Sequence, residues 1–463
     1  MSFNRLPGVV LKLLTLVLVA VARPAGATLP HYVFAHYMVC YATYGDWADT
    51  NLTIAGYERE IQAAQAAGID GFALNLGAYD DPTQLYYNNR VAMIYEAAEQ
   101  LGTGFKLFFS IDFNGTNEII DAVQTYAQRT NTFLWNGSVV LSTYAHNGLP
   151  WAYIRGQLST NGVNTFFIPY LYSTPMHELP AYADGVGILS TWGNALDGLF
   201  LWAAGGNPNL LVQCNLGYNQ ACIEAGKPFM ATFAPTYWGC VQTTLARRYY
   251  ESQGGEGTAM QWNSIITNQP DWVEICTWND FNESTYVSPV DNPGQYFPNI
   301  ASPYRYSHAG YLELTKYYIN WYKSGQQPPI NQDALFYFYR TSPYSTIATD
   351  TNDTVQPQWW GDVPAADNIY NTVLLTAPAQ LIVASGGNLS TNSLPAGISH
   401  VETPFTPGPQ NFTIQRNGQT VVSLAGTDIL STIQVYDFFT ASGFAYGVAQ
   451  PPVPTGMHIG PAN

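Results

Sequence analysis

The stretch 276–284 groups the side chains of this chain that are best suited to chemistry. An apolar, strand-like run, 272–276, is followed by Thr-Trp-Asn-Asp280-Phe-Asn-Glu283-Ser, so two carboxylates stand three residues apart among aromatic and amide side chains. Hydrolysis of a glycosidic bond needs two carboxyl groups, one that protonates the leaving oxygen and one that activates water or attacks carbon. The alternative is a polar loop that caps the following helix, with Asp280 or Asn282 as the N-cap.

An isolated D-x-x-E pattern is usually a polar capping loop. Whether Asp280 and Glu283 form a catalytic pair therefore depends on the elements that position them. From about residue 31 to 330, apolar strand-like runs alternate with helical patterns such as 53–67, 83–101 and 117–129. Eight such units in about 250 residues predict a parallel (β/α)8 TIM barrel. An open doubly wound sheet is the competing architecture, but no glycine-rich dinucleotide fingerprint follows the first strand. We expect the strands at 32–39, 71–76, 106–112, 138–143, 165–172, 198–203, 228–234 and 272–278.

Active sites of such barrels lie at the C-terminal ends of the strands. Asp280 and Glu283 follow the eighth strand and are the expected acid pair. Asp112 ends the third strand, where it rivals one of the two or else orients them or binds a sugar hydroxyl. Asp70 begins the second strand, a position that favours a buried structural carboxylate. The residues expected to bind substrate are His36, Asn75, Tyr170, Trp202, Tyr237, Trp238, Trp278 and Asn279.

Each of these binding residues has a structural alternative. A lone histidine in an apolar strand, such as His36, is more often a core residue with paired polar atoms. Asn75 and Asn279 either bind hydroxyls or hold the acids in place. For Trp202, stacking on a sugar and core packing are equally favoured. For Trp238, the loop position after Pro235 favours stacking.

The composition changes near residue 326, where Pro, Thr, Ser, Asn and Gly become frequent. Short alternating runs with turn residues predict a β-sandwich. Asn417-Gly418 predicts a hairpin turn. We therefore expect a catalytic barrel at 28–330 and an accessory β-sandwich at 331–463. Its expected strands are 334–340, 370–376, 380–383, 410–415, 420–425 and 429–438.

The N-terminus predicts secretion. Basic residues, a short apolar core and Ala25-Gly26-Ala27 resemble a signal peptide over 1–27. Of the five cysteines, we expect Cys214 and Cys222 to close a short loop and to form a disulfide. No C-x-x-C pair or histidine cluster predicts a metal site. Seven N-x-S/T sequons occur, at Asn51, Asn114, Asn136, Asn282, Asn352, Asn388 and Asn411. Asn282 lies inside the proposed site, so we expect it to carry no glycan.

The charge balance argues against some partners. The net charge is −16 with only 16 basic residues, and none form a dense run. Nucleic-acid binding needs clustered Lys and Arg, so a nucleic-acid partner is not expected. Aromatic residues make up 14% of the chain, including 12 Trp and 33 Tyr, which suits sugar stacking. We expect a polysaccharide partner, no cofactor, no membrane span and a monomer.

Four motifs in order resemble glycoside hydrolase family 71, the fungal α-1,3-glucanases or mutanases. They are His31-Tyr-Val-Phe-Ala-His36-Tyr-Met-Val, Ala67-Gly-Ile-Asp70-Gly-Phe-Ala-Leu-Asn75, Phe105-Lys-Leu-Phe-Phe-Ser-Ile-Asp112 and Thr277-Trp-Asn-Asp280-Phe-Asn-Glu283-Ser. The resemblance implies a (β/α)8 catalytic domain with an accessory β domain, and endo-hydrolysis of α-1,3-glucan with inversion. It maps the essential acids onto Asp280 and Glu283 and also implicates Asp70, against its position in the strand. Cys40 stands where the family suggests a small residue.

The expected function is therefore that of a secreted, inverting α-1,3-glucan hydrolase of the extracellular space or cell wall. Glu283 is the expected general acid and Asp280 the expected base, with exchange of the roles left open. Two rivals stand beside this prediction: a non-catalytic carbohydrate-binding cell-wall protein and a hydrolase of another glycan. The bare residues do not fix the anomeric configuration or the linkage, which rest on the resemblance.

Overall fold

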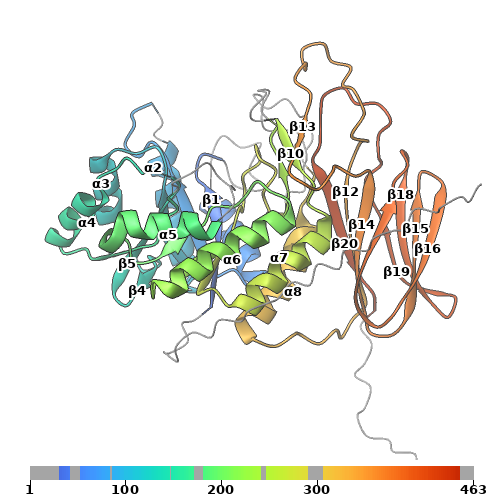
Figure 1. Ribbon diagram of the computed structural model, residues 1–463, viewed down its shortest axis with the longest axis horizontal. Coiled ribbons are helices and arrows are strands. Elements are labelled where there is room, and N and C mark those ends of the chain that lie inside the picture. The colour runs from blue at the N-terminus through green and yellow to red at the C-terminus, as the bar shows by residue number, and fades with distance from the viewer. Residues whose placement is uncertain are drawn as a thin grey trace, which may run out of the picture.

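The computed structural model describes residues 31–41, 53–83, 86–145, 147–171, 181–240, 247–289 and 306–448. The predicted signal peptide, 1–27, lies outside the described residues. In Figure 1 the helices and the parallel strands occupy one half of the molecule, and the C-terminal strands form layered sheets beside them. The protein is thus a mixed α/β protein with several separate sheets.

The larger sheet contains eight parallel strands in a curled arrangement. Its hydrogen-bonded order is β5-β3-β2-β1-β11-β8-β7, with β6 beside β5 and the short antiparallel β4 at an edge. The two ends of this path also touch, since Phe200 N donates to Pro169 O at 2.9 Å and Asp197 N to Phe167 O at 2.8 Å. The strands are β1 (Tyr32–Met38), β2 (Gly71–Leu76), β3 (Lys106–Ile111), β4 (Leu134–Trp135), β5 (Ser138–Thr143), β6 (Thr165–Phe167), β7 (Leu199–Phe200), β8 (Phe229–Phe233) and β11 (Trp272–Ile275).

Helices connect these strands and cover the outside of the sheet (Figure 1). Local signals explain where they start: the Thr53 side chain accepts from Gly56 N at the start of α1, and Asn207 accepts from Leu210 N ahead of Pro208 in α6. The helices are α1 (Ile54–Ala66), α2 (Tyr86–Leu101), α3 (Thr116–Tyr126), α4 (Trp151–Thr160), α5 (Ala181–Trp192), α6 (Pro208–Glu224), α7 (Gly254–Asn268) and α8 (Ala309–Ser324), with a 3-10 turn, η1 (Gly193–Ala195).

The predicted disulfide between Cys214 and Cys222 is wrong. Both residues lie within the single helix α6, and both are free buried thiols. Eight residues of helix separate the two Cα atoms by about 12 Å along the axis, whereas a disulfide needs Cα atoms within about 7 Å. The loop inferred between them is the helix itself, whose buried face both side chains join.

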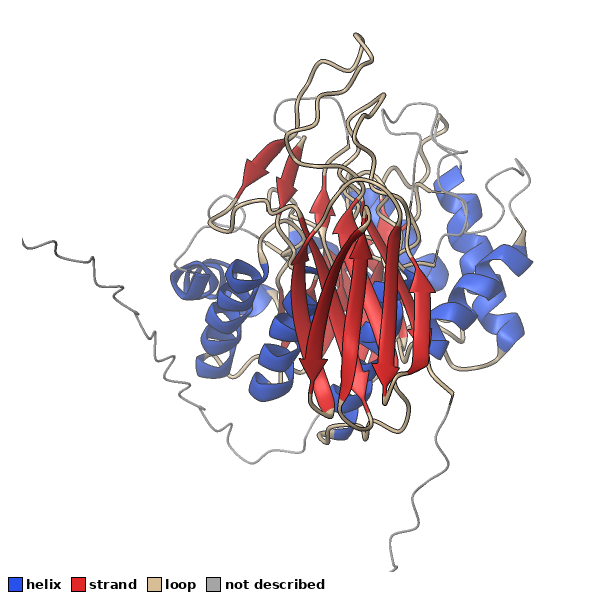
Figure 2. Cartoon of the chain, turned by 90° about the vertical axis from the view of Figure 1, so that its right-hand side faces the viewer, coloured by secondary structure: helices blue, strands red, loops and turns tan. Residues whose placement is uncertain are grey.

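The C-terminal strands form two four-stranded antiparallel sheets, ordered β17-β14-β12-β20 and β16-β15-β18-β19. Figure 2 shows these sheets as stacked layers, and apolar residues of both, such as Val373 and Phe412, share one core. The strands are β12 (Ala334–Arg340), β14 (Asn368–Leu375), β15 (Ala379–Ser385), β16 (Asn388–Leu394), β17 (Gly397–Pro404), β18 (Gln410–Arg416), β19 (Gln419–Ala425) and β20 (Thr440–Tyr446).

Two local predictions for this region have different outcomes. The Asn417-Gly418 turn is confirmed, because both residues have positive φ, 52° and 75°, and join β18 to β19. The strand expected at 429–438 is wrong, since Ile429 and Ile433 make only isolated bridges. This stretch is apolar because Tyr436 and Phe438 are buried as irregular chain between elements.

The two halves share a core as well as a chain. Helices α7 and α8 pack on β12, β14 and β20, so that Phe336, Phe338 and Tyr370 belong to the same cluster as the residues of the parallel sheet. A small third sheet also joins the halves. In it, β10 (Arg248–Tyr250) pairs with β9 (Tyr237–Trp238) on one side and with β13 (Gln358–Trp360) on the other.

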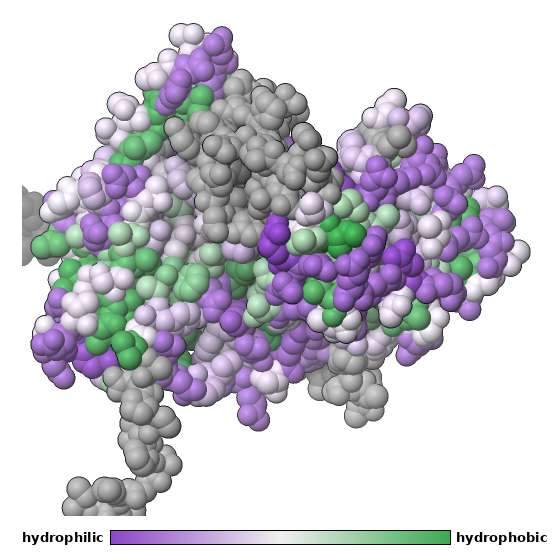
Figure 3. Space-filling model, turned by 180° about the vertical axis from the view of Figure 1, so that it is seen from behind, coloured by the Kyte–Doolittle hydropathy of each residue, from purple (hydrophilic) through white to green (hydrophobic). Residues whose placement is uncertain are grey.

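The surface seen in Figure 3 is mostly hydrophilic, with hydrophobic residues in separate groups. Among the described residues, no helix has the length and apolar character needed to cross a membrane.

Candidate active site

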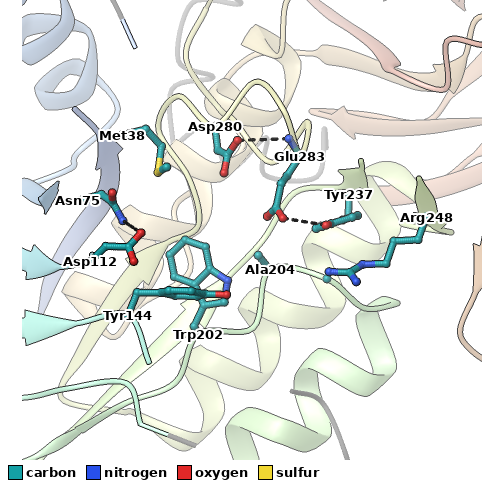
Figure 4. Close-up of a pocket in the computed structure, with 11 residues that line it drawn as sticks. Met38, Asn75, Asp112, Tyr144, Trp202, Ala204, Tyr237, Arg248, Asp280 and Glu283 are labelled. Atoms are coloured by element: carbon teal, nitrogen blue, oxygen red, sulfur yellow. Dashed lines mark hydrogen bonds between the residues drawn. The ribbon is translucent and has the colours of Figure 1, made fainter. Parts of the chain in front are cut away.

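A cavity of about 170 Å³ lies where the parallel strands end. Figure 4 shows three carboxylates directed into it, with Asp280 and Glu283 on one side and Asp112 opposite. The cavity therefore joins the loop after β11 to the end of β2 and to residues that follow β3, β5 and β7. Its lining consists of Met38, Asn75, Asp112, Tyr144, Trp202, Ala204, Gly205, Tyr237, Arg248, Asp280 and Glu283.

Asp280 is held by its own loop. Its backbone N–H donates to Thr277 Oγ1 at 2.7 Å, and its Oδ1 accepts from Asn282 N at 3.1 Å and from Glu283 N at 3.2 Å. Residues 281–284 form a turn and not a helix, so Asp280 does not cap a helix there. The backbone hydrogen bonds fold the turn around the carboxylate, which brings both acids of the D-x-x-E motif to one cavity.

Glu283 is a carboxyl group whose surroundings favour the protonated form. Burial raises its pKa above the ordinary range, and the hydrogen bond from Tyr237 and the positive charge of Arg248 offset part of this rise. Tyr237 OH donates to Glu283 Oε1 at 2.8 Å (Figure 4). The guanidinium of Arg248 lies over the Tyr237 ring, 5.2 Å from its centroid. A backbone bond from Trp238 N to Glu283 O, 2.8 Å, fixes the turn to β9.

Asp112 enters the cavity from the opposite side, just after β3. Asn75, near the end of β2, donates from Nδ2 to Asp112 Oδ2 at 3.4 Å. Asn114 Nδ2 donates to the backbone oxygen of Asp112 at 2.6 Å, which anchors the start of this loop. Asp112 and Asn75, each predicted as a site residue, thus lie together, within reach of the space that Asp280 and Glu283 face.

Asp70 lies away from the cavity. It precedes β2, at the end of the sheet opposite the acids, where it accepts from Val33 N at 2.8 Å and pairs with Lys323 Nζ at 2.6 Å. These contacts tie β1 and α8 together. The geometry gives Asp70 a structural role of the kind its position in the sequence favours.

The aromatic candidates divide into two groups. Trp202 and Tyr237 line the cavity. Trp238 and Trp278 are fully buried, Trp238 against Phe438 and Trp278 against Phe72, so neither presents a ring face to a ligand. For Trp238 this corrects the expectation of stacking, because the loop that carries it is the strand β9, covered by C-terminal residues. Tyr170 is also buried, against Tyr144.

His36 and Asn279 lie behind the cavity. His36 Nδ1 is 2.7 Å from Glu274 Oε1 in a fully buried pair, and its ring packs edge-on against Trp202 with centroids 4.5 Å apart. Burial raises the pKa of Glu274, and the hydrogen bond with His36 offsets part of that rise. Asn279 accepts from Met38 N at 2.7 Å and donates to Met38 O at 3.1 Å, which fastens the loop after β11 to β1.

Five lining residues were not predicted: Met38, Tyr144, Ala204, Gly205 and Arg248. Tyr144 directly follows β5, so the rule that placed Asp112 would also have found it. Ala204 and Gly205 follow the sixth parallel strand, where small side chains leave space. Arg248 has no such signal, because it reaches the cavity from the small sheet outside the parallel strands. Among the described residues, no group of three or more His, Cys, Asp or Glu side chains is placed to hold a metal ion.

Comparison with known proteins gives one family over nearly the whole chain. The profile of glycosyl hydrolase family 71 matches residues 30–448. A mutanase of Penicillium rubens is 30% identical over 94% of this chain and 95% of its own length. A glucan endo-1,3-α-glucosidase of Schizosaccharomyces pombe is 30% identical over 85% of this chain and 91% of its own. Among solved structures, a family 99 endo-α-mannosidase of Bacteroides thetaiotaomicron aligns with a TM-score of 0.49 at 15% identity, over 64% of this chain and 99% of the other.

Proposed function

The chain belongs to glycosyl hydrolase family 71, and from this membership we propose that it hydrolyses internal linkages of α-1,3-glucan, as the names of two Schizosaccharomyces pombe relatives state for those proteins. The observation that carries the proposal is the convergence of Glu283, Asp280 and Asp112 on one cavity at the strand ends. The family match confirms the resemblance to this family that the four sequence motifs indicate.

Glu283 is proposed as the general acid. An acid must hold its proton at the working pH and release it to the departing glycosidic oxygen. Burial raises the pKa of Glu283 and so favours the protonated form, as this role requires. Tyr237 keeps the carboxyl group oriented toward the cavity and stabilises the carboxylate left after proton transfer.

Asp280 is proposed as the base, with inversion in a single step. Water attacks the anomeric carbon as the bond to the leaving oxygen breaks; the water proton passes to Asp280, and the proton of Glu283 passes to the leaving oxygen. Backbone N–H groups at 3.1 and 3.2 Å hold Asp280 Oδ1 in place for this transfer. Asp112 is the rival base, because it faces the same cavity from the other side.

The finer architecture is part of the proposal. We take the parallel sheet as a closed (β/α)8 barrel, supported by the hydrogen bonds between residues 167–169 and 197–200. The two C-terminal sheets are taken as a β-sandwich, supported by their common core. The boundaries remain 28–330 and 331–463 after a signal peptide at 1–27. Secretion, action on cell-wall glucan and a monomeric state complete this proposal.

The test measures reducing ends and the anomer first released, by NMR, on insoluble α-1,3-glucan with β-1,3-glucan, starch and cellulose as controls. The proposal expects release from α-1,3-glucan alone with inverted, β-configured product. Glu283→Gln should reduce kcat by about 10³-fold or more. A first product that keeps the α configuration would reject inversion, and equal release from a control glycan would reject the substrate. Binding without any hydrolysis would favour the non-catalytic carbohydrate-binding protein.

Azide separates the two candidate bases. A small anionic nucleophile needs no base, so azide should restore turnover to Asp280→Asn and give a β-glycosyl azide. Asp112→Asn should gain nothing from azide. The reverse pattern would transfer the role of base to Asp112.

A further inference from the structure

The described tryptophans are mostly buried, and the two most exposed are neighbours in the chain. Trp359 and Trp360 have 37% and 38% of their surface exposed and are consecutive residues of β13. They come from the C-terminal half of the chain, from the segment 341–367 that separates β12 from β14. Connections of this length are uncommon in compact domains, and this one contains the short strand β13.

This segment is fixed to the parallel half of the molecule. A buried ion pair joins Arg247 to Asp353, and Gln358 N donates to Arg247 O at 2.8 Å. Beyond the strand, Gly361 has φ +97°, and a Cβ there would lie 3.0 Å from Asn207 Nδ2. Asn207 Nδ2 also donates to Asp362 Oδ1. The exposed rings are therefore carried on an anchored strand, which limits the entropy lost when a ligand binds them.

Two side chains, those of Arg248 and Tyr237, connect Trp360 to Glu283. The guanidinium of Arg248 lies 5.5 Å from the centroid of the Trp360 ring and 5.2 Å from that of Tyr237. Tyr237 in turn donates to Glu283. Arg248 and Tyr237 line the cavity, so Trp360 lies one residue beyond its wall. Trp359 projects from the opposite face of β13, because successive side chains of a strand alternate.

The cavity is too small for a polymer. Its volume of about 170 Å³ is below the roughly 300–1,000 Å³ of pockets that enclose drug-sized ligands. A glucan chain cleaved there must continue across the rim. An aromatic face fixed at that rim offers a large apolar surface to the C–H groups of a sugar ring.

We propose that Trp360 forms an additional glucan-binding subsite, in which its ring stacks on a glucosyl residue of a chain whose scissile bond lies in the cavity. This inference rests on the proposed function for the identity of the chain. It gives the C-terminal half a direct part in substrate binding, through β13. Arg248 positions the Trp360 ring and separates the subsite from Glu283.

The test compares Trp360→Ala with Trp359→Ala, a control of equal size and exposure on the opposite face of the same strand. The substrates are α-1,3-linked oligosaccharides from the trisaccharide to the octasaccharide. Trp360→Ala should lower kcat/KM on the longest by about 10-fold through KM, with little change on the shortest. Trp360→Phe should recover part of the loss, and Trp359→Ala should match the wild type. Melting temperatures show whether each variant is folded.

The proposed subsite would be rejected if Trp360→Ala lowered kcat/KM equally on short and long substrates or left it unchanged. It would also be rejected if Trp359→Ala lowered kcat/KM as much as Trp360→Ala does. A binding experiment distinguishes rejection of the subsite from rejection of the proposed function. Octasaccharide is titrated calorimetrically into Glu283→Gln and into Glu283→Gln with Trp360→Ala. An inactive wild type whose binding still depends on Trp360 would reject only the proposed hydrolysis. Absence of binding in both titrations, with an inactive wild type, would reject both proposals.

Discussion

At the scale of single residues, Glu283 has a protonation state set by opposing influences. Burial raises its pKa, whereas Tyr237 and Arg248 stabilise the ionised form. A general acid works while protonated, so activity should fall as pH rises through the pKa of Glu283. That descending limb should lie above the pH at which an ordinary glutamate, with a pKa of about 4.3, loses its proton.

Tyr237→Phe tests this balance. It removes the hydrogen bond that favours the Glu283 carboxylate, so the pKa of Glu283 should rise further and the descending limb of kcat/KM should move to higher pH. The measurement is kcat/KM against pH on a soluble α-1,3-linked oligosaccharide. Tyr250→Phe is the matched control, because Tyr250 packs against Tyr237 at 5.5 Å without a hydrogen bond to Glu283. A limb that stays in place or moves to lower pH would contradict the role of Tyr237.

At the scale of elements, largely apolar strands of both halves were the most predictable. Observed bounds match the expected ones for β2, β5 and β12, because largely apolar runs are typical of buried strands. The parallel strands β6 and β7 are shorter than expected. Strands β16 and β17 were missed, since β16 reads Asn-Leu-Ser-Thr-Asn-Ser-Leu and is largely exposed. Its place in the sheet comes from pairing with β15, which no local pattern of β16 encodes.

The cavity residues likewise divide into those that local sequence patterns predict and those that they do not. Asp112, Asn75 and Trp202 follow directly from the rule that strand ends converge. Arg248 was not predictable, because β10 exists only through pairing with β9 and with β13, more than a hundred residues away in the chain. The burial of Trp238 depends likewise on Phe438 from the C-terminal half. Contacts between distant segments thus account for what local patterns missed.

The cysteines give a prediction at the scale of an element. All five are free thiols, and helix α6 keeps Cys214 and Cys222 too far apart to join. The unreduced protein, unfolded in guanidinium chloride at neutral pH, should therefore titrate five thiols with Ellman's reagent. A reductant should leave the melting temperature unchanged. Recovery of three thiols or one would contradict the structure, and peptide mapping of alkylated protein would identify the pair.

At the scale of the whole molecule, the C-terminal sheets are part of the support of the catalytic half. Helix α8 lies against β20 and α7 against β14, and the residues between them belong to the main core. In the buried imidazole of His308, at the start of α8, Nε2 lies 3.0 Å from Thr440 O and Nδ1 lies 2.6 Å from Tyr286 O. These contacts connect β20 to the chain just beyond the turn that carries Asp280 and Glu283. Unfolding should accordingly be cooperative, with one transition in calorimetry.

Gly310→Ala probes this contact. In α8 a Cβ at Gly310 would lie 2.9 Å from Gly443 N and 3.0 Å from Ser442 Cβ, so the helix and β20 would have to separate. Overpacking of this kind costs about 1–3 kcal/mol. Gly156→Ala in α4 is the control, since a Cβ there meets nothing within 4 Å, and alanine in an open helix position stabilises by about 0.5–1 kcal/mol.

The free energy of unfolding of both variants is measured by denaturant titration, monitored by circular dichroism. Because the contact joins the two halves, the loss in Gly310→Ala should appear in the one transition that all probes report. Two separated transitions, with only the C-terminal half weakened, would show that the halves fold independently. In that case Trp360 would sit on a domain able to move relative to Glu283, and the subsite would lose the rigid placement on which its affinity depends.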